Sequence, residues 1–330
     1  MTLATDTATW QHELSNVLSD PVELCEVLGL NTDEADRIEA ACAGFPLRIP
    51  RPYLQRIRAN NPNDPLLLQA LPTTQELIED PAFSVDPLEE ADVSPVNGLL
   101  HKYAGRVLIV LNGHCAIHCR YCFRRHFPYA DHRISPENWT QILDHIRSDD
   151  SIHEVIFSGG DPLSCNDDTL ARRINSLADI EHVSTIRFHT RLPIMIPQRV
   201  TPSLIDAITS TRLHCVMVMH CNHAQEIDER VSTAFDALHQ AGIVLLNQSV
   251  LLKGINDNVH TLKELSQVLF HNHTLPYYIH LLDSVQGAAH FNISRERASI
   301  IHSELRASLP GYLVPNFAME EAKARNKTVI

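Results

Sequence analysis

Long apolar runs and an excess of positive charge are both missing from this sequence of 330 residues. No segment approaches the roughly 18 consecutive apolar residues of a membrane-spanning helix, so we expect no contact with the membrane. The N-terminal residues lack a basic segment followed by an apolar one, which argues against a secretory signal. The formal net charge of −13 disfavours nucleic acid as the main partner, because phosphate binding needs a basic surface. We therefore expect a cytoplasmic protein of ordinary globular composition.

Cysteine is present in moderate number, and its distribution is uneven. Of eight cysteines, three fall in one short stretch as Cys115, Cys119 and Cys122. In a chain of this length without a signal segment, cysteines are more often reduced thiols or metal ligands than disulfides. Three others are interpreted as small buried side chains: Cys165, Cys215 and Cys221.

From about residue 106 onward, short apolar segments rich in β-branched residues alternate with segments of helical period. The predicted strands cover 106–112, 154–159, 185–190, 214–220, 244–252 and 275–282, and helical patterns lie between them, for example at 136–148, 167–178 and 202–211. Strands that recur about every 30 residues with helices between them are typical of parallel βα units. Six such units predict an α/β fold, a partial TIM-like (β/α)6 barrel, with an open doubly wound sheet as the alternative. Either fold binds ligands at the carboxyl ends of its strands.

The two ends of the chain differ from this central pattern. Residues 1–95 carry helical patterns interrupted by prolines, so we expect a helical N-terminal region with a linker near 81–95. The barrel is predicted over 96–309. A short, charged C-terminal segment is predicted over 310–330.

The spacing Cys115-x3-Cys119-x2-Cys122 falls directly after the first predicted barrel strand, in a loop at its carboxyl end. Three thiolates can hold a [4Fe–4S] cluster and leave one iron without a protein ligand, which opens a position for a substrate or cofactor. Two alternatives stay open. One is a zinc site completed by His114, His118, His126 or a distant cysteine. The other is three unrelated buried cysteines.

This motif, with Tyr121 before the last cysteine and a (β/α)6 pattern behind it, resembles the radical S-adenosylmethionine (radical SAM) family. The resemblance implies that the open iron binds S-adenosylmethionine, which is cleaved to a 5′-deoxyadenosyl radical. The stretch SGGDPL is similar to the family's Gly-Gly-acid segment, which contacts S-adenosylmethionine. Its candidate cofactor-binding residues are Ser158, Gly159, Gly160 and Asp161.

Further motifs resemble the lysine 2,3-aminomutase family over residues 96–330. They lie at 189–202, 247–258, 276–291 and 311–318. The similarity is greatest to the branch that supplies (R)-β-lysine for modification of elongation factor P. It implies L-lysine as substrate, a flavodoxin or ferredoxin as electron donor, and a functional link to elongation factor P and its ligase.

The same resemblance implies pyridoxal 5′-phosphate as a second organic cofactor, bound covalently by Lys327 in the sequence RNKTVI. It assigns Arg124 to the substrate carboxylate, and Asp283 and Glu320 to the ε-ammonium group. Other cofactor-binding candidates are Lys102, Arg106, Arg191 and Gln248. Two further basic residues are expected at the mouth of the barrel: His189 and Arg199.

Three other functions compete with this hypothesis. The first is an aminomutase for another amino acid such as glutamate, which Asp283 disfavours because it would repel a side-chain carboxylate. The second is a radical SAM enzyme that uses no pyridoxal phosphate. The third is a zinc-binding interaction protein without enzymatic activity.

Overall fold

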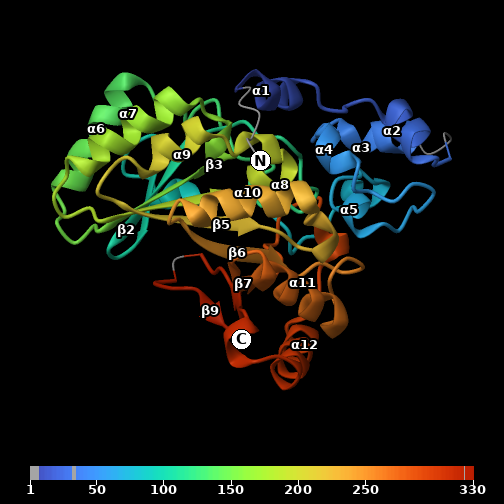
Figure 1. The fold of residues 1–330 in the computed structure, drawn as a ribbon. Coiled ribbons are helices and arrows are strands. Elements are labelled where there is room, and N and C mark those ends of the chain that lie inside the picture. Colours follow the sequence, from blue (N-terminus) through green and yellow to red (C-terminus); the bar gives the residue numbers. More distant parts are fainter. Residues whose placement is uncertain (1–6, 32–34, 323) are drawn as a thin grey trace.

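One sheet with helices on its outside organises the molecule (Figure 1). The computed structural model describes residues 7–31, 35–322 and 324–330. Within them, the strands are β1 (Leu99–Tyr103), β2 (Arg106–Asn112), β3 (Glu154–Gly159), β4 (Thr185–Thr190), β5 (His214–His220), β6 (Val244–Val250), β7 (Thr274–His280), β8 (Asn316–Met319) and β9 (Thr328–Val329). Their order in space is their order in the sequence.

The strands from β2 to β8 are parallel, while β1 and β9 pair antiparallel at the two edges. Among the described residues β1 and β9 do not pair with each other, so the sheet stays open. The α/β partial-barrel prediction is confirmed, and its six predicted strands are β2 to β7. The strands β1, β8 and β9 were not predicted, because each is short and carries a weak alternating pattern.

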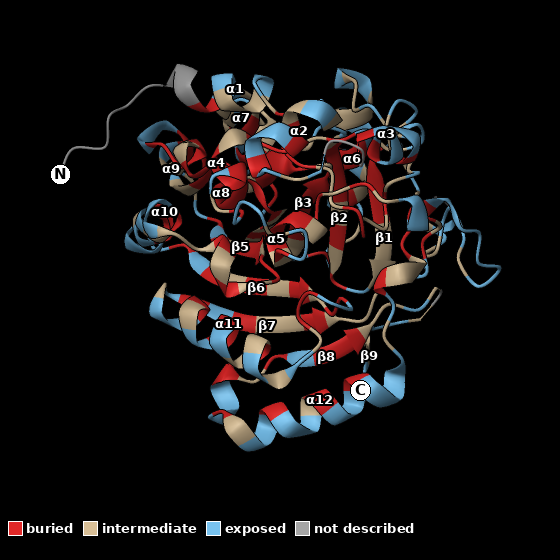
Figure 2. Ribbon diagram, turned by 90° about the vertical axis from the view of Figure 1, so that its right-hand side faces the viewer, coloured by how far each residue is buried: buried red, intermediate tan, exposed pale blue. Residues whose placement is uncertain are grey.

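Helices cover the outer face of the sheet, with exposed faces outward and buried faces toward the strands (Figure 2). The helices that connect strands are α6 (Pro136–Arg147), α7 (Asp167–Ala178), α8 (Leu192–Met195), α9 (Pro202–Thr209), α10 (Glu229–Gln240), α11 (Val259–His271) and α12 (Arg295–Ser308). Helix α6 begins where the sequence predicts, because Ser135 Oγ accepts a hydrogen bond from Asn138 N at 3.1 Å and Pro136 occupies the first turn. No helix in the described part of the chain is long and apolar enough to cross a membrane.

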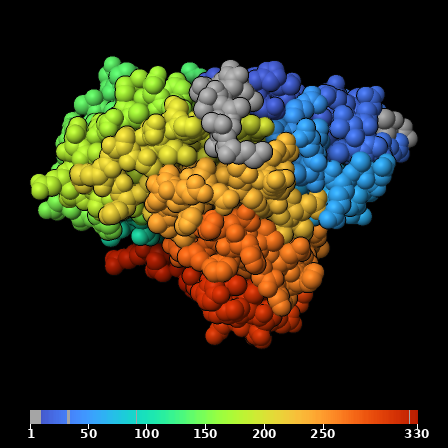
Figure 3. All heavy atoms as spheres, viewed as in Figure 1, coloured from blue at the N-terminus to red at the C-terminus, as the bar shows by residue number. Residues whose placement is uncertain are grey.

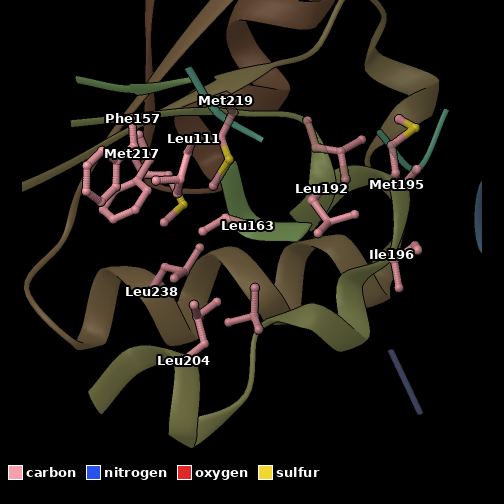
Figure 4. Close-up of a cluster of buried hydrophobic side chains, with 14 of the residues drawn as sticks. Leu111, Phe157, Leu163, Leu192, Met195, Ile196, Leu204, Met217, Met219 and Leu238 are labelled. Atoms are coloured by element: carbon pink, nitrogen blue, oxygen red, sulfur yellow. The ribbon is translucent and has the colours of Figure 1, made fainter. Parts of the chain in front are cut away.

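Apolar side chains from strands and helices meet in the core between them. Figure 4 shows Leu111, Phe157 and Met217 of the sheet beside Leu204 of α9 and Leu238 of α10. All of these belong to one buried cluster. Burial of such a side chain stabilises the fold by about 1.5–3 kcal/mol, so this core holds the strand ends in fixed positions.

The N-terminal region forms a helical layer at one end of the sheet, blue in Figure 1. Its helices are α1 (Thr7–Ser15), α2 (Pro21–Leu28), α3 (Ala35–Cys42), α4 (Arg51–Leu54) and α5 (Pro65–Leu68), followed by the short 3-10 helices η2 (Thr74–Leu77) and η3 (Glu90–Val93). Residues 81–95, which were predicted to be a linker, are joined to the loop after β7 by backbone hydrogen bonds. Ser84 N donates to Ser284 O, and Gln286 N donates to Ser84 O, both at 2.8 Å.

The C-terminal segment extends the sheet. Strand β8 pairs with β7, and β9 folds back on β8, with Ile330 N donating to Phe317 O at 2.9 Å. In the space-filling view the red atoms of the C-terminal part of the chain lie at the lower edge of the molecule, beneath the orange ones (Figure 3). The C-terminal segment therefore brings the last residues of the chain to the open side of the barrel.

Candidate active site

A cavity of about 810 Å³ lies within the curve of the sheet, and β1 to β7 and β9 contribute residues to its wall. Cavities of this size accommodate cofactor-sized ligands. The structure brings all the predicted catalytic, cofactor-binding and metal-binding residues to this wall. They are Lys102, Arg106, Cys115, Cys119, Cys122, Arg124, Ser158, Gly159, Gly160, Asp161, Arg191, Gln248, Asp283, Glu320 and Lys327.

The three cysteines lie on the loop after β2, as predicted. Within it Cys122 N donates to Cys119 O at 3.0 Å, and Arg48 of the N-terminal region donates through Nε to Cys115 O at 2.8 Å. Burial, and then the charge of neighbouring thiolates, raises the pKa of Cys115 well above its usual range and that of Cys122 to about 12. These thiols are close enough for their thiolates to repel one another, so a positively charged metal group would suit them.

Two of the histidines considered as zinc ligands make other contacts. The imidazole of His118 stacks on Phe45 at 4.6 Å, with Nδ1 placed 2.9 Å from Pro46 O. The imidazole of His126 lies 3.2 Å from Gln286 O through Nε2. Across the described residues, no three His, Cys, Asp or Glu side chains converge on a single-ion position. A fourth protein ligand for a closed zinc site is therefore not supplied by these histidines.

A buried ionic network fixes the cysteine loop to the N-terminal region. Glu76 of η2 accepts from Arg120 Nε at 2.8 Å and Nη2 at 2.6 Å, and also from Arg125 Nη2 at 2.7 Å. All three side chains are almost completely shielded from solvent. Sequence reasoning missed Glu76, because a glutamate in an irregular N-terminal segment gives no local signal.

The glycine pair after β3 packs against the base of the cysteine loop. A Cβ on Gly159 would lie 2.4 Å from Asn112 O, and one on Gly160 would lie 2.6 Å from His114 O. Gly159 also has φ +124°, a conformation that disfavours other residues. The predicted close approach of backbone is therefore confirmed. The backbone that approaches these glycines belongs to the end of β2 and to the start of the cysteine loop.

Asp161 uses its carboxylate to join two loops. It accepts from Leu163 N at 3.0 Å and Thr190 Oγ1 at 2.7 Å, and from Arg191 N and Leu192 N at 2.8 and 2.9 Å. Burial raises its pKa, and these hydrogen bonds oppose the increase. Asp161 therefore connects the end of β3 to the end of β4 at the cavity wall.

Arg191 lies directly against the cysteine loop. Its Nη1 donates to Cys119 Sγ and Tyr121 Oη at 2.8 Å each, and its Nη2 donates to Gln69 Oε1 at 2.6 Å and Glu226 Oε2 at 2.8 Å. Its Nε is buried without a partner in the described residues. We call Cys115, Cys119, Cys122 and Arg191 the thiol cluster.

Lys327 lies beside Glu320 at the open edge of the barrel. The carboxylate of Glu320 contacts Lys327 Nζ at 2.5 Å, Lys102 Nζ at 2.9 Å and the hydroxyl of Tyr103. Burial alone would raise the pKa of Glu320, but Lys327 and these hydrogen bonds lower it to about 2. Because Lys102 belongs to β1 and Glu320 follows β8, these ion pairs connect the two sides of the open barrel.

Arg106 is the unpaired cation of this region. Its guanidinium stacks over Tyr103 at 4.6 Å and has no ion-pair partner in the described part of the chain. An unpaired guanidinium at a cavity wall suits an anionic group such as a phosphate. We call Lys102, Arg106, Glu320 and Lys327 the lysine cluster.

Asp283, after β7, is partly buried in the cavity. No side chain among the described residues donates a hydrogen bond to its carboxylate. Burial raises its pKa to about 7, with Glu320 and Glu90 adding to the increase and Lys327 opposing it. A carboxylate in this position would be stabilised by a cationic ligand.

Arg124 has a partner that the sequence did not suggest. Glu90 of η3 accepts from its Nε at 2.8 Å and from Nη2 at 2.6 Å, while Nη1 lies 3.1 Å from Ser158 Oγ and 3.4 Å from Gly159 O. Burial would lower the pKa of Arg124, but Glu90 raises it above its usual value. Glu90 was missed because its segment was interpreted as a linker.

Of the two remaining basic candidates, one lines the cavity and the other does not. His189 lines the cavity, and burial and neighbouring cations lower its pKa well below the usual range. The prediction that Arg199 lies at the mouth of the barrel is wrong. Its side chain is fully buried, stacks over Trp10 of α1 at 4.3 Å and pairs with Asp167 at 2.7 Å. It joins the N-terminal region to the outer side of the barrel.

Comparison with known proteins identifies the group to which this arrangement belongs. The Radical SAM superfamily model matches residues 109–265. The L-lysine 2,3-aminomutase of Haemophilus influenzae is 47% identical over 97% of this chain and 95% of its own. The L-lysine 2,3-aminomutase of Escherichia coli is 45% identical over 97% of this chain and 93% of its own. The chain belongs to the L-lysine 2,3-aminomutase family.

Membership in the L-lysine 2,3-aminomutase family makes this chain a radical SAM isomerase, and this superfamily implies a [4Fe–4S] cluster and S-adenosylmethionine. Among solved structures, a radical SAM methyltransferase from Sphaerobacter thermophilus superposes with a TM-score of 0.49 at 16% identity, over 67% of this chain and 68% of that one. The thiol cluster places three cysteines within the range that this superfamily model matches.

Proposed function

We propose that this protein converts L-lysine into β-lysine as a radical SAM enzyme that also uses pyridoxal 5′-phosphate. One observation carries the proposal: the thiol cluster and the lysine cluster line the same cavity, with Arg124 and Asp283 on its wall. The reaction removes a hydrogen atom from the β-carbon, moves the α-nitrogen to that carbon and returns hydrogen to the α-carbon. Substrate and product are therefore isomers, and no net oxidant is needed.

The cofactors and the chain have separate tasks. When bound, the cluster and S-adenosylmethionine supply a carbon-centred radical, and pyridoxal phosphate supplies a conjugated ring that stabilises a radical during nitrogen migration. Cys115, Cys119 and Cys122 would hold the cluster. The backbone of Ser158 to Gly160 and the side chain of Gln248 would border S-adenosylmethionine.

The lysine cluster would hold pyridoxal phosphate. Lys327 Nζ would form the covalent bond, and Arg106 and Lys102 would attract the phosphate. In the structure Glu320 pairs with both lysines, so a phosphate on Lys102 would compete with this carboxylate. Glu320 would then be released for the role that the sequence suggested, contact with the ε-ammonium group.

The substrate would be held from both ends. Arg124 would contact the carboxylate, and Asp283 would contact the ε-ammonium group, so that the β-carbon keeps one orientation. Asp283, which has no ion-pair partner among the described residues, would repel the side-chain carboxylate of glutamate. The (R) configuration, a flavodoxin or ferredoxin as electron donor and the link to elongation factor P follow from the sequence resemblance. A cytoplasmic location follows from the composition of the chain.

The test is anaerobic reconstitution with iron, sulfide and pyridoxal phosphate, followed by assay of L-lysine with S-adenosylmethionine and dithionite. We expect β-lysine, and we expect none from Lys327→Ala. Cleavage of S-adenosylmethionine with lysine unchanged would refute L-lysine as the substrate. No cleavage by a protein that carries its full cluster would refute the radical reaction, and turnover of glutamate instead would favour the competing aminomutase.

A further inference from the structure

Glu90 is a carboxylate from outside the barrel that reaches the cavity wall. It lies on η3, in the segment before β1, and forms a two-pronged ion pair with Arg124. The side chains are only 12% and 5% exposed. Charge-assisted pairs with this geometry are strong and directional, so Glu90 fixes the plane of the guanidinium.

The hydrogen bonds of Arg124 define what remains for a ligand. A guanidinium has five N–H groups. The Glu90 carboxylate accepts hydrogen bonds from Nε and from Nη2 of Arg124. The Nη1 group donates to Ser158 Oγ and Gly159 O. Arg124 therefore offers a ligand an oriented N–H group, while its positive charge is already matched by a buried carboxylate.

The same cavity wall carries a third charged side chain, Asp283. Among the described residues it has no ion-pair partner, whereas Arg124 and Glu90 compensate each other. Glu90 is close enough to raise the pKa of Asp283. Together these three side chains carry one net negative charge when Asp283 is ionised, which complements an amino acid with an additional ammonium group.

We propose that Glu90 is a specificity-determining residue: by neutralising Arg124, it makes this wall select amino acids with a cationic side chain over those with a neutral one. The inference rests on the proposed function, because it takes L-lysine as the substrate. Without Glu90, the free guanidinium would bind any amino-acid carboxylate, and the requirement for a side-chain cation would weaken.

The test measures equilibrium binding of L-lysine and L-norleucine, which has no ε-ammonium group. Calorimetry is done on protein that holds its cluster, S-adenosylmethionine and pyridoxal phosphate, without reductant, so that no turnover occurs. In Glu90→Gln we expect the ratio of lysine affinity to norleucine affinity to fall about tenfold or more, because one charge is removed from a partly buried set. Glu89→Gln, an exposed neighbour that loses the same charge, is expected to keep the wild-type ratio.

A double variant covers the case in which Glu90→Gln leaves a buried guanidinium that prevents folding. Glu90→Gln with Arg124→Gln removes both charges and leaves the net charge of the wall unchanged. Both ligands should bind more weakly, and the ratio should stay within about threefold of the wild-type value, since a pair acts as a unit. A collapse of the ratio in the double variant would overturn the proposal.

Two other outcomes of the single variant would also overturn it. If the ratio does not change, Glu90 has no part in selection. If lysine and norleucine both bind more tightly by the same factor, Glu90 merely competes with the substrate carboxylate for Arg124. A wild-type protein that binds neither ligand, or binds both equally, would contradict L-lysine as substrate and so the proposed function itself.

Discussion

The thiol cluster and the lysine cluster line one cavity but are built in opposite ways. The three thiols lie on the loop after β2, and Arg191 lies after β4 and is surrounded by buried partners. The lysine cluster combines residues of β1, of β2 and of the segment from Glu320 to Lys327. Its cation Arg106, on β2, has no ion-pair partner among the described residues. A preorganised set suits a permanent cluster, and an exchangeable set of ion pairs suits a cofactor and substrate that enter.

The largest expected effect is at the thiol cluster. Cys119→Ala removes one of three thiolates and the sulfur that Arg191 contacts, so we expect loss of iron and a fall in lysine turnover of about 1,000-fold or more. Iron content and product are measured together. Cys215→Ala is the matched control, because Cys215 is buried on β5 and does not line the cavity. Equal loss in both variants would contradict a special role for the loop.

Glu76 tests whether the thiol cluster depends on preorganisation. Glu76→Gln leaves Arg120 and Arg125 buried without their carboxylate, which should lower the free energy of unfolding by about 3–5 kcal/mol. Denaturant unfolding of the cofactor-free protein measures this effect. Glu79→Gln, on an exposed position of the same region, should change it by less than about 0.5 kcal/mol. A small effect at Glu76 would show that the loop is held by other contacts.

A substitution of Asp283 tests the part of the cavity that would bind the substrate. Asp283→Asn should raise the KM for L-lysine about 10- to 100-fold, because the ε-ammonium group loses its charged partner. The pKa of Asp283 is raised to about 7, so the carboxyl gains a proton as the pH falls through that value. KM for lysine should therefore rise from pH 8 to pH 6 in the wild type and change little in Asp283→Asn. A pH profile that is the same in both would assign the titration to another group.

The smallest effect is expected at Lys102. Lys102→Arg keeps the charge, so the affinity for pyridoxal phosphate should stay within about threefold of the wild type. Lys102→Gln removes the charge and should weaken binding about tenfold, as followed by absorbance titration. Equal affinity of all three proteins would remove Lys102 from the phosphate site.

The sequence predicted the barrel well because each strand and helix carries its own local pattern. Helix α6, for example, has its cap at Ser135 and an apolar stripe from Ile142 to Ile146. The cysteine loop was predictable for the same reason, since its three ligands lie close together in the chain. Local patterns did not reveal Glu76, which pairs with two arginines of the cysteine loop, or Glu90, which reaches the cavity wall. Both lie in irregular segments of the N-terminal region.

The same limit explains the errors. Arg199 was expected at the barrel mouth, but it is buried against Trp10, a contact between residues far apart in the sequence. The backbone hydrogen bonds between Ser84 of the predicted linker and Ser284 and Gln286 also join distant parts of the chain. Polar side chains are placed by such distant contacts, and a pattern of a few residues carries no information about them.

The central claim is that the two clusters serve one reaction. The most direct test uses L-lysine with deuterium at the β-carbon, S-adenosylmethionine and the reduced holoenzyme, with mass analysis of the 5′-deoxyadenosine formed. We predict that deuterium appears in 5′-deoxyadenosine, because hydrogen passes from a substrate held near the lysine cluster to a radical formed at the thiol cluster. Deoxyadenosine that forms without label at saturating deuterated lysine would contradict the account.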